Sequence, residues 1–183
     1  MKQLKWLAGS AALLAAVLAI EGWPAYQGLA HNREWKAITA APEGTELQGL
    51  KVKIHTQVAA IAAQRPERAA MLVRLEIQGT QAAGQDWGMC KVSLRNASDE
   101  VWMPLTSATT DGVIKALSPD HKNAGPCKPY MAENTEGEQT WYADQLFMLP
   151  SSALQGLRLY VSGQGTRPQA LAFTLQPEVK HLQ

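Results

Sequence analysis

Few residues of this sequence have the types and spacing that catalysis or metal binding requires. The four histidines are spread along 183 residues, at positions His31, His55, His121 and His181. None is paired with a cysteine or an acidic residue at a metal-ligand spacing such as CxxC or HxxxH. The pair Asp120-His121 near Cys127 comes closest, and a polar loop beside a disulfide explains it better. We expect no metal ion and no cofactor.

Catalytic motifs are also missing from the sequence. There is no GxSxG, P-loop or dinucleotide-binding glycine pattern. Glycosidase chemistry needs a pair of carboxyl groups, and the acidic residues Asp99, Glu100, Glu136 and Glu138 all lie in turn contexts. The sequence therefore predicts a protein that is not an enzyme.

The large aromatic side chains allow two interpretations. Trp and Tyr can build a contact face for a peptide or a sugar, because they are stiff and amphipathic. They can equally fill the core, since six Trp stand against only two Phe, and the core is the more economical explanation. The candidate contact surface consists of Trp102, Tyr142, Tyr160 and His121. Tyr142 is the strongest of these, because it should face away from its neighbour Trp141.

The two cysteines, Cys90 and Cys127, have one possible pairing. In an exported chain one disulfide is expected, with two buried reduced thiols as the alternative. Closing this loop would contribute about 4 kcal/mol by the chain-entropy relation.

The N-terminal segment is basic and then apolar. Lys2 and Lys5 precede the uncharged stretch Leu7 to Ile20. A single-pass anchor needs roughly 17 to 25 mostly apolar residues, and Trp6 and Trp23 stand where an aromatic belt would flank it. We expect a span in the inner (cytoplasmic) membrane, with the N-terminus inside and the remaining chain in the periplasm or outside. The alternative is a cleaved signal peptide and a secreted protein.

The remaining chain alternates between short strands and turns. The predicted strands are Leu50–Val58, Met71–Gln78, Cys90–Arg95, Val101–Met103, Val113–Leu117, Thr140–Leu149, Leu157–Val161 and Leu171–Leu175. In the first strand the apolar face should hold Leu50, Val52, Ile54, Thr56 and Val58. In the second strand we expect Arg74, Glu76 and Gln78 to face water.

These segments give a mainly β fold, an antiparallel β-sandwich of about seven or eight strands. We divide the chain into four parts. They are a membrane anchor or signal peptide at 1–23, a helical stalk and linker at 24–48, the β-sandwich at 49–177 and a tail at 178–183.

A family resemblance follows from the segments LKVKI, MLVRLEIQ, CKVSLRN, NASDE, WYADQLFMLP, LRLYV and LAFTL. Their order resembles the telokin-like, immunoglobulin-like extracytoplasmic domains of unknown function that are attached to a membrane anchor. The resemblance covers Leu50 to Leu175 and implies an immunoglobulin-like sandwich. It implies no catalytic residue.

The predicted function is a non-enzymatic protein-interaction or assembly module of the cell envelope. Its partners would be the membrane, through the N-terminal helix, and another envelope protein. We expect no nucleic-acid partner, because the formal net charge is only +1. The alternative is a small-ligand or glycan-binding domain that uses Trp and Tyr side chains.

Overall fold

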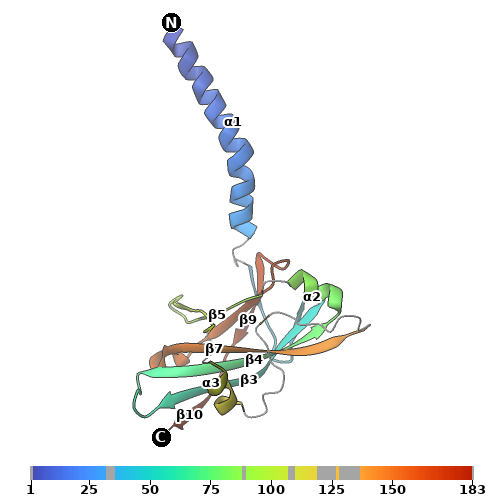
Figure 1. The fold of residues 1–183 in the computed structure, drawn as a ribbon, viewed down its shortest axis with the longest axis vertical. Helices are drawn as coiled ribbons and strands as arrows, with labels where there is room; N and C mark the ends of the chain where they lie inside the picture. The colour runs from blue at the N-terminus through green and yellow to red at the C-terminus, as the bar shows by residue number, and fades with distance from the viewer. Residues whose placement is uncertain are drawn as a thin grey trace.

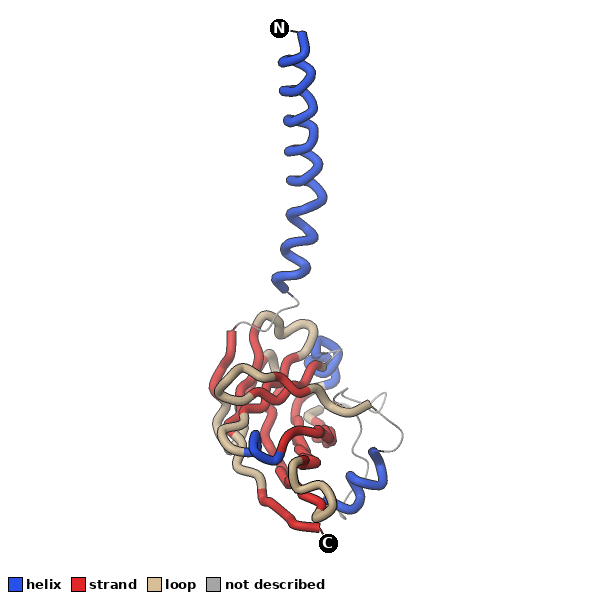
Figure 2. The backbone as a smooth tube through the Cα atoms, turned by 90° about the vertical axis from the view of Figure 1, so that its left-hand side faces the viewer, coloured by secondary structure: helices blue, strands red, loops and turns tan. Residues whose placement is uncertain are grey.

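A long N-terminal helix stands apart from a β-domain (Figures 1 and 2). The computed structural model describes residues 2–31, 36–87, 90–106, 110–118, 127 and 137–182. Helix α1 spans Lys2–His31. Among the described residues, no helix combines the length and the apolar character needed to cross a bilayer. The predicted single-pass span is therefore not supported.

The β-domain contains two sheets, so the prediction of a mainly β fold is confirmed, and the arrangement is consistent with a β-sandwich. Sheet A has the order β1 (Lys36–Thr39), β9 (Gln169–Thr174), β8 (Arg158–Ser162), β5 (Lys91–Arg95), β6 (Val101–Trp102). Sheet B has the order β10 (Glu178–Leu182), β3 (Leu50–Ala62), β4 (Arg68–Gly79), β7 (Gln139–Pro150), and β2 (Thr45–Leu47) also pairs with β3.

Most strand pairs are antiparallel, as predicted, but each sheet has one parallel pair. β1 runs parallel to β9, and β10 runs parallel to β3. Each pair joins two strands that are more than 100 residues apart in the sequence, so no single helical crossover connects them. The prediction of a purely antiparallel sandwich is wrong at these two pairings.

The main core lies between the sheets and is filled from their inner faces. Trp87 is fully buried there, and its indole Nε1 donates a hydrogen bond to the Leu47 carbonyl oxygen at 3.2 Å. Gly163 lies against the Trp87 backbone, where an added Cβ would be 2.6 Å from the Trp87 Cα. This close approach requires a glycine. Trp87 is therefore a core residue.

In the described part of the chain, three segments between the strands are helical. α2 spans Gln81–Trp87, and α3 spans Thr110–Leu117. The predicted strand Val113–Leu117 is therefore wrong. Ile114 and Leu117 are three residues apart, so they share one face of the helix and pack together on sheet B. The third is the short helix η1, which spans Ser151–Leu154 directly after β7.

The segments flanking the predicted sandwich also contain strands. Within the predicted stalk and linker, α1 continues to His31 and is followed by β1 and β2. The predicted tail contains β10, whose five residues are all exposed. Its pairing with β3 uses backbone hydrogen bonds, so the side chains need no apolar pattern. The sheets thus begin before residue 49 and end beyond residue 177.

A β-bulge changes the facing of β3. The pairing with β4 shifts register between Ile54 and Thr56, which leaves His55 as the extra residue. Beyond the bulge the facing reverses, so Gln57 lies opposite Val73 on the inner side while Val58 packs under α3. The predicted common face of Leu50 through Val58 is therefore wrong after Ile54.

Candidate contact surface on sheet B

The outer face of sheet B has two halves, which β3, β4 and β7 build together. In one half, helix α3 covers an apolar group made of Val58, Ala60, Leu72, Ile114, Leu117 and Leu146. In the other half the strands place polar side chains in register. Lys53 lies opposite Glu76, which lies opposite Tyr142. The ladder hydrogen bonds of three paired strands thus hold these polar groups in register.

Glu76 is the centre of what we call the Glu76 cluster, defined as Lys53, His55, Glu76, Gln78 and Tyr142. Its carboxylate accepts hydrogen bonds from Lys53 Nζ at 2.8 Å and from Gln78 Nε2 at 2.9 Å. His55 Nδ1 lies 3.2 Å from the second carboxylate oxygen. Glu76 itself is only 6% exposed. The bulge brings His55 to the same carboxylate as Lys53, and re-aiming a side chain is a common effect of a bulge.

The pKa of the Glu76 carboxyl reflects two opposed effects. Burial raises this pKa, because it disfavours the charged form, while the hydrogen bonds and charges of Lys53 and His55 lower it. The net result is a pKa below the ordinary value. Glu76 is therefore a stable carboxylate at neutral pH and a fixed acceptor beneath the surface.

An ion pair lies next to the cluster. Arg74 Nε is 2.7 Å from one oxygen of Asp144, and Nη2 is 2.9 Å from the other. Both residues are buried, at 5% and 9% exposure. The prediction that Arg74 and Glu76 face water is therefore wrong. They do alternate onto the outer face, but that face is covered at Arg74 and Glu76.

The exposed part of the cluster is His55 and Tyr142. The two rings meet edge to face with centroids 5.1 Å apart. The His55 side chain is 44% exposed and that of Lys53 is 35% exposed, while Tyr142 is half-buried. An aromatic ring, an imidazole and an ammonium group therefore reach solvent above a buried carboxylate. This combination suits polar and aromatic contacts with a partner.

The other predicted contact residues lie elsewhere. Tyr160 is on β8 of sheet A, where the Arg95 guanidinium carbon stands 4.3 Å from its ring centroid. Trp102, on β6, is half-buried and packs against the main core. His121 lies outside the described residues. The structure therefore does not join Trp102 and Tyr160 to Tyr142 in one surface, because they belong to the other sheet.

The predicted disulfide between Cys90 and Cys127 is confirmed, with the two Cα atoms 5.5 Å apart. Cys127 is buried in the main core and Cys90 packs against it. The bond therefore ties the start of β5 to a residue 37 positions later. Of the described residues, no three His, Cys, Asp or Glu side chains gather where they could hold a metal ion.

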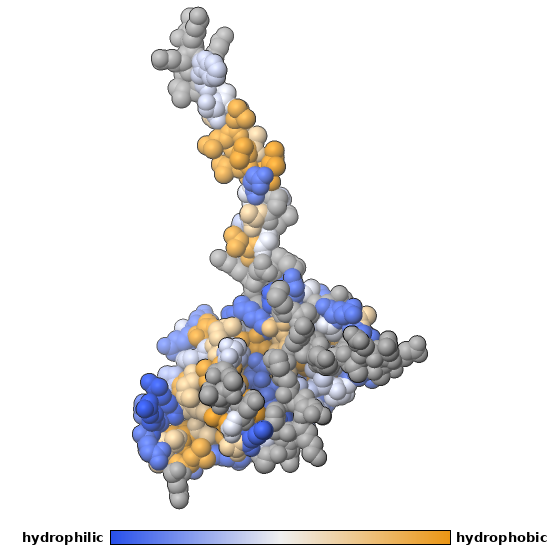
Figure 3. Space-filling view, in the orientation of Figure 1, coloured by the Kyte–Doolittle hydropathy of each residue, from blue (hydrophilic) through white to orange (hydrophobic). Residues whose placement is uncertain are grey.

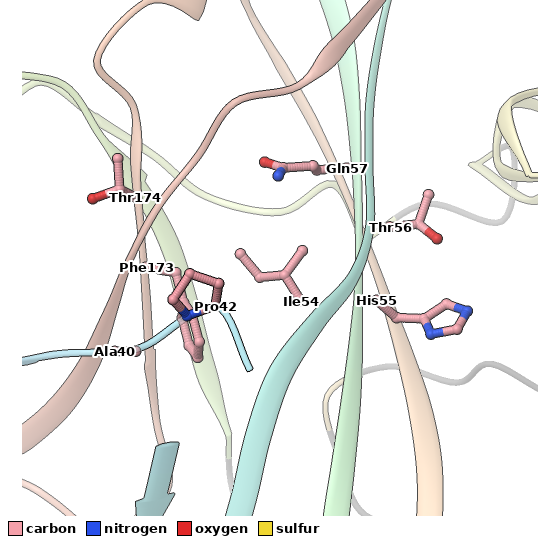
Figure 4. A pocket seen from close by; sticks show the side chains of 8 residues that line it. All are labelled: Ala40, Pro42, Ile54, His55, Thr56, Gln57, Phe173 and Thr174. Atoms are coloured by element: carbon pink, nitrogen blue, oxygen red, sulfur yellow. The ribbon is translucent and has the colours of Figure 1, made fainter. Parts of the chain in front are cut away.

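Two pockets open along the inner side of β3, and sequence reasoning found neither of them. The first holds about 300 Å³ and is lined by Ala40, Pro42, Ile54, His55, Thr56, Gln57, Phe173 and Thr174. Figure 4 shows Ile54 and Gln57 pointing toward Pro42 and Phe173, while His55 points to the other side of the strand. The second pocket, of about 490 Å³, lies further along, between Ile61, Leu154, Leu175 and Val179.

Comparisons with known proteins do not assign a family. No protein-family model matches the sequence, and no curated protein matches it. A solved structure of a putative lipoprotein from Staphylococcus aureus subsp. aureus NCTC 8325 is similar at 9% sequence identity and a TM-score of 0.45. The match covers 80% of this chain and 98% of that one. The telokin-like or immunoglobulin-like assignment is not confirmed by this likeness and stays a prediction.

Proposed function

We propose that this protein is an envelope-associated, non-enzymatic interaction module that binds another envelope protein. The observation that supports the proposal is the Glu76 cluster. Tyr142 and His55 are exposed in part, and the buried carboxylate and the three strands beneath hold them in one arrangement. A pre-ordered surface loses less conformational entropy on binding, so a small area can suffice.

Two features support a location outside the cytoplasm. The disulfide fits an oxidising compartment. In α1, the apolar residues Leu13, Leu14, Val17, Leu18 and Ile20 are 53–70% exposed. Figure 3 shows the apolar band that runs along the middle of this helix. Side chains of this kind are unfavourable in water, so we propose that α1 directs export and membrane association.

The route of attachment has a direct test. Membrane and soluble fractions of cells that express the full chain are separated and probed for the protein. Protein of full-length mass in the membrane fraction supports retention through α1. A shorter protein in the soluble extracytoplasmic fraction supports a cleaved signal peptide. Protein in the cytoplasmic fraction would contradict the proposed location.

The partner is tested by crosslinking in cells, followed by pull-down and mass spectrometry. Tyr142→Ala should reduce the yield of one dominant crosslinked protein by about tenfold or more. Tyr160→Ala is the matched control, because it removes the same side chain from the other sheet. Equal loss with both variants, or no partner above background, would contradict the proposal.

A small-ligand function is the second candidate, and the 300 Å³ pocket supports it. This volume is at the lower end of the range of ligand sites, and the lining combines apolar side chains with the Gln57 amide. Intrinsic tryptophan fluorescence, recorded against a panel of glycans and small molecules, tests this candidate. A saturable change with one compound, together with a blank crosslinking experiment, would favour it over the interaction module.

A further inference from the structure

One edge of β3 is only partly covered by neighbouring strands. On the opposite edge β4 pairs with Leu50–Ala60. On this edge β2 pairs with Leu50–Val52, and β10 pairs with Val58–Ala62. In the described part of the chain, no strand pairs with residues 53–57 on this side. We call this uncovered stretch the β3 window. At 3.3 Å per residue it is about 17 Å long.

Backbone groups of β3 face into the window. Leu47 and Leu50 flank a two-residue turn, in which Gln48 and Gly49 both have positive φ. Residues that flank such a turn exchange both backbone hydrogen bonds. Leu50 therefore points its N–H and C=O toward β2, and every second residue does the same up to the bulge. Ile54 accordingly presents its N–H and C=O to the window.

The window opens into the 300 Å³ pocket, which lies between two segments that cross from one sheet to the other. Residues 40–44 connect β1 to β2, and residues 175–177 connect β9 to β10. At the second crossing, the Gln176 N–H donates a hydrogen bond to Gln57 Oε1 at 2.8 Å. The floor between the crossings is apolar, because it contains Ile54 and Phe173.

We propose that the β3 window binds a short extended peptide from another protein, which adds to β3 as a strand. This inference rests on the proposed interaction function and names the form of the partner. An added strand satisfies the backbone groups at Ile54, and every second side chain of the peptide enters the pocket. The inward side chain has to be apolar, since it meets Ile54 and Phe173.

The charge of the outward residues follows from the neighbouring face. Lys53 and His55 project from the outer side of β3 at the window, where both contact Glu76. The partly exposed Lys53 ammonium has three donors and uses one of them on Glu76. Acidic residues on either side of the inward apolar residue are therefore complementary. The window is best suited to an extended acidic–apolar–acidic segment.

The test uses the full chain and a synthetic peptide, acetyl-Thr-Glu-Leu-Glu-Thr-amide, with binding measured by calorimetry. A twin with Lys in place of Glu should bind at least about tenfold more weakly. Two further peptides carry backbone N-methyl groups, one peptide at Leu and the other at both Glu residues. In an added strand, alternate N–H groups face β3, so only one of these two sets can donate to it. One of these two should lose at least about tenfold in affinity, and the other should lose less.

A pair of protein variants locates the binding. Pro42→Trp fills the mouth of the pocket from an exposed turn and should weaken peptide binding at least about tenfold. Thr39→Trp is the matched control, because Thr39 is an exposed strand position outside the pocket lining. Its affinity for the peptide should stay within about twofold of that of the parent protein. Circular dichroism and melting temperature verify that both variants fold. No binding at about 1 mM peptide, or equal binding by the two variants, would overturn the inference.

The same variants separate this inference from the proposed function. A crosslinked partner that Tyr142→Ala loses and Pro42→Trp keeps would refute strand addition at the window while the interaction module stands. Peptide binding that Pro42→Trp abolishes, in a protein that crosslinks to no partner in cells, would support the window and count against the proposed cellular role.

Discussion

Both halves of the outer face of sheet B bury side chains, but one half buries apolar side chains and the other buries charged ones. Under α3, Val58, Leu72 and Leu146 form an apolar row that needs no specific partner geometry. In the next row Arg74 and Asp144 bury opposite charges, which requires two hydrogen bonds in good alignment. Buried ion pairs are often no more stabilising than apolar side chains of the same volume. The comparison therefore suggests that stability alone does not explain the charged half.

The largest effect should come from breaking the ion pair on one side. Arg74→Met leaves the Asp144 carboxylate buried without its guanidinium partner and should cost about 3–5 kcal/mol. The double variant Arg74→Met/Asp144→Leu should recover most of that loss, because neither charge of the pair is left buried alone. Urea unfolding of the two variants measures both values. A double variant as unstable as the single one would show that the pair itself stabilises the fold.

The apolar half should respond by cavity formation instead. Leu72 is fully buried, so Leu72→Ala should cost about 2–4 kcal/mol. Val113→Ala, at a position 40% exposed on the covering helix, is the control and should cost less than about 0.5 kcal/mol. Similar losses for the two variants would mean that α3 does not cover Leu72 in solution. Urea unfolding is again the measurement.

The sequence predicted the strands of this face but not the division between its halves. Alternation placed Arg74 and Glu76 on the outer side of β4 correctly. It could not show that this side is covered, because α3 and Asp144 come some 36 to 70 residues later. The bulge at His55 was equally hidden, since Thr56 and Val58 continue the apolar alternation without a break. Strand existence is local information, and burial of the second face is not.

The candidate site shows the same limit. Tyr142 was predicted from its facing relative to Trp141, and the structure places it beside His55. Trp102 and Tyr160 were grouped with it by residue type alone, and they lie on the other sheet. The β3 window depends on two strands, β2 and β10, that are more than 130 residues apart and pair with the same edge. No sequence pattern near residue 54 predicts that β2 and β10 pair with the same edge of β3.

The pH dependence of stability sharpens the comparison within the charged half. The pKa of Glu76 in the folded protein is lower than its ordinary value. The stability that the ionised carboxylate contributes is therefore complete at a pH above the ordinary pKa. It is lost as the pH falls through the folded pKa. Glu76→Gln should therefore be less stable than the parent chain at neutral pH, and the difference should shrink in acid. Urea unfolding over a pH series measures it. A difference that grows in acid would contradict this sign.

The smallest effect on stability is expected at the exposed end of the cluster. The Lys53 side chain is 35% exposed, so solvent screens its ion pair with Glu76. Lys53→Met should cost less than about 1 kcal/mol, and added salt should reduce the difference. Lys51→Met, two residues earlier on the same face, is the control for losing a positive charge.

The same Lys53 variant separates structural from contact roles. If Lys53 faces an acidic residue of a bound peptide, Lys53→Met should weaken binding of the acidic peptide several-fold, although the stability of the fold hardly changes. Lys51→Met should leave the affinity nearly unchanged, because Lys51 lies beside β2 and outside the window. A loss of stability without a loss of affinity would make the Lys53–Glu76 pair a structural contact only. The charged half would then owe its contact role to His55 and Tyr142.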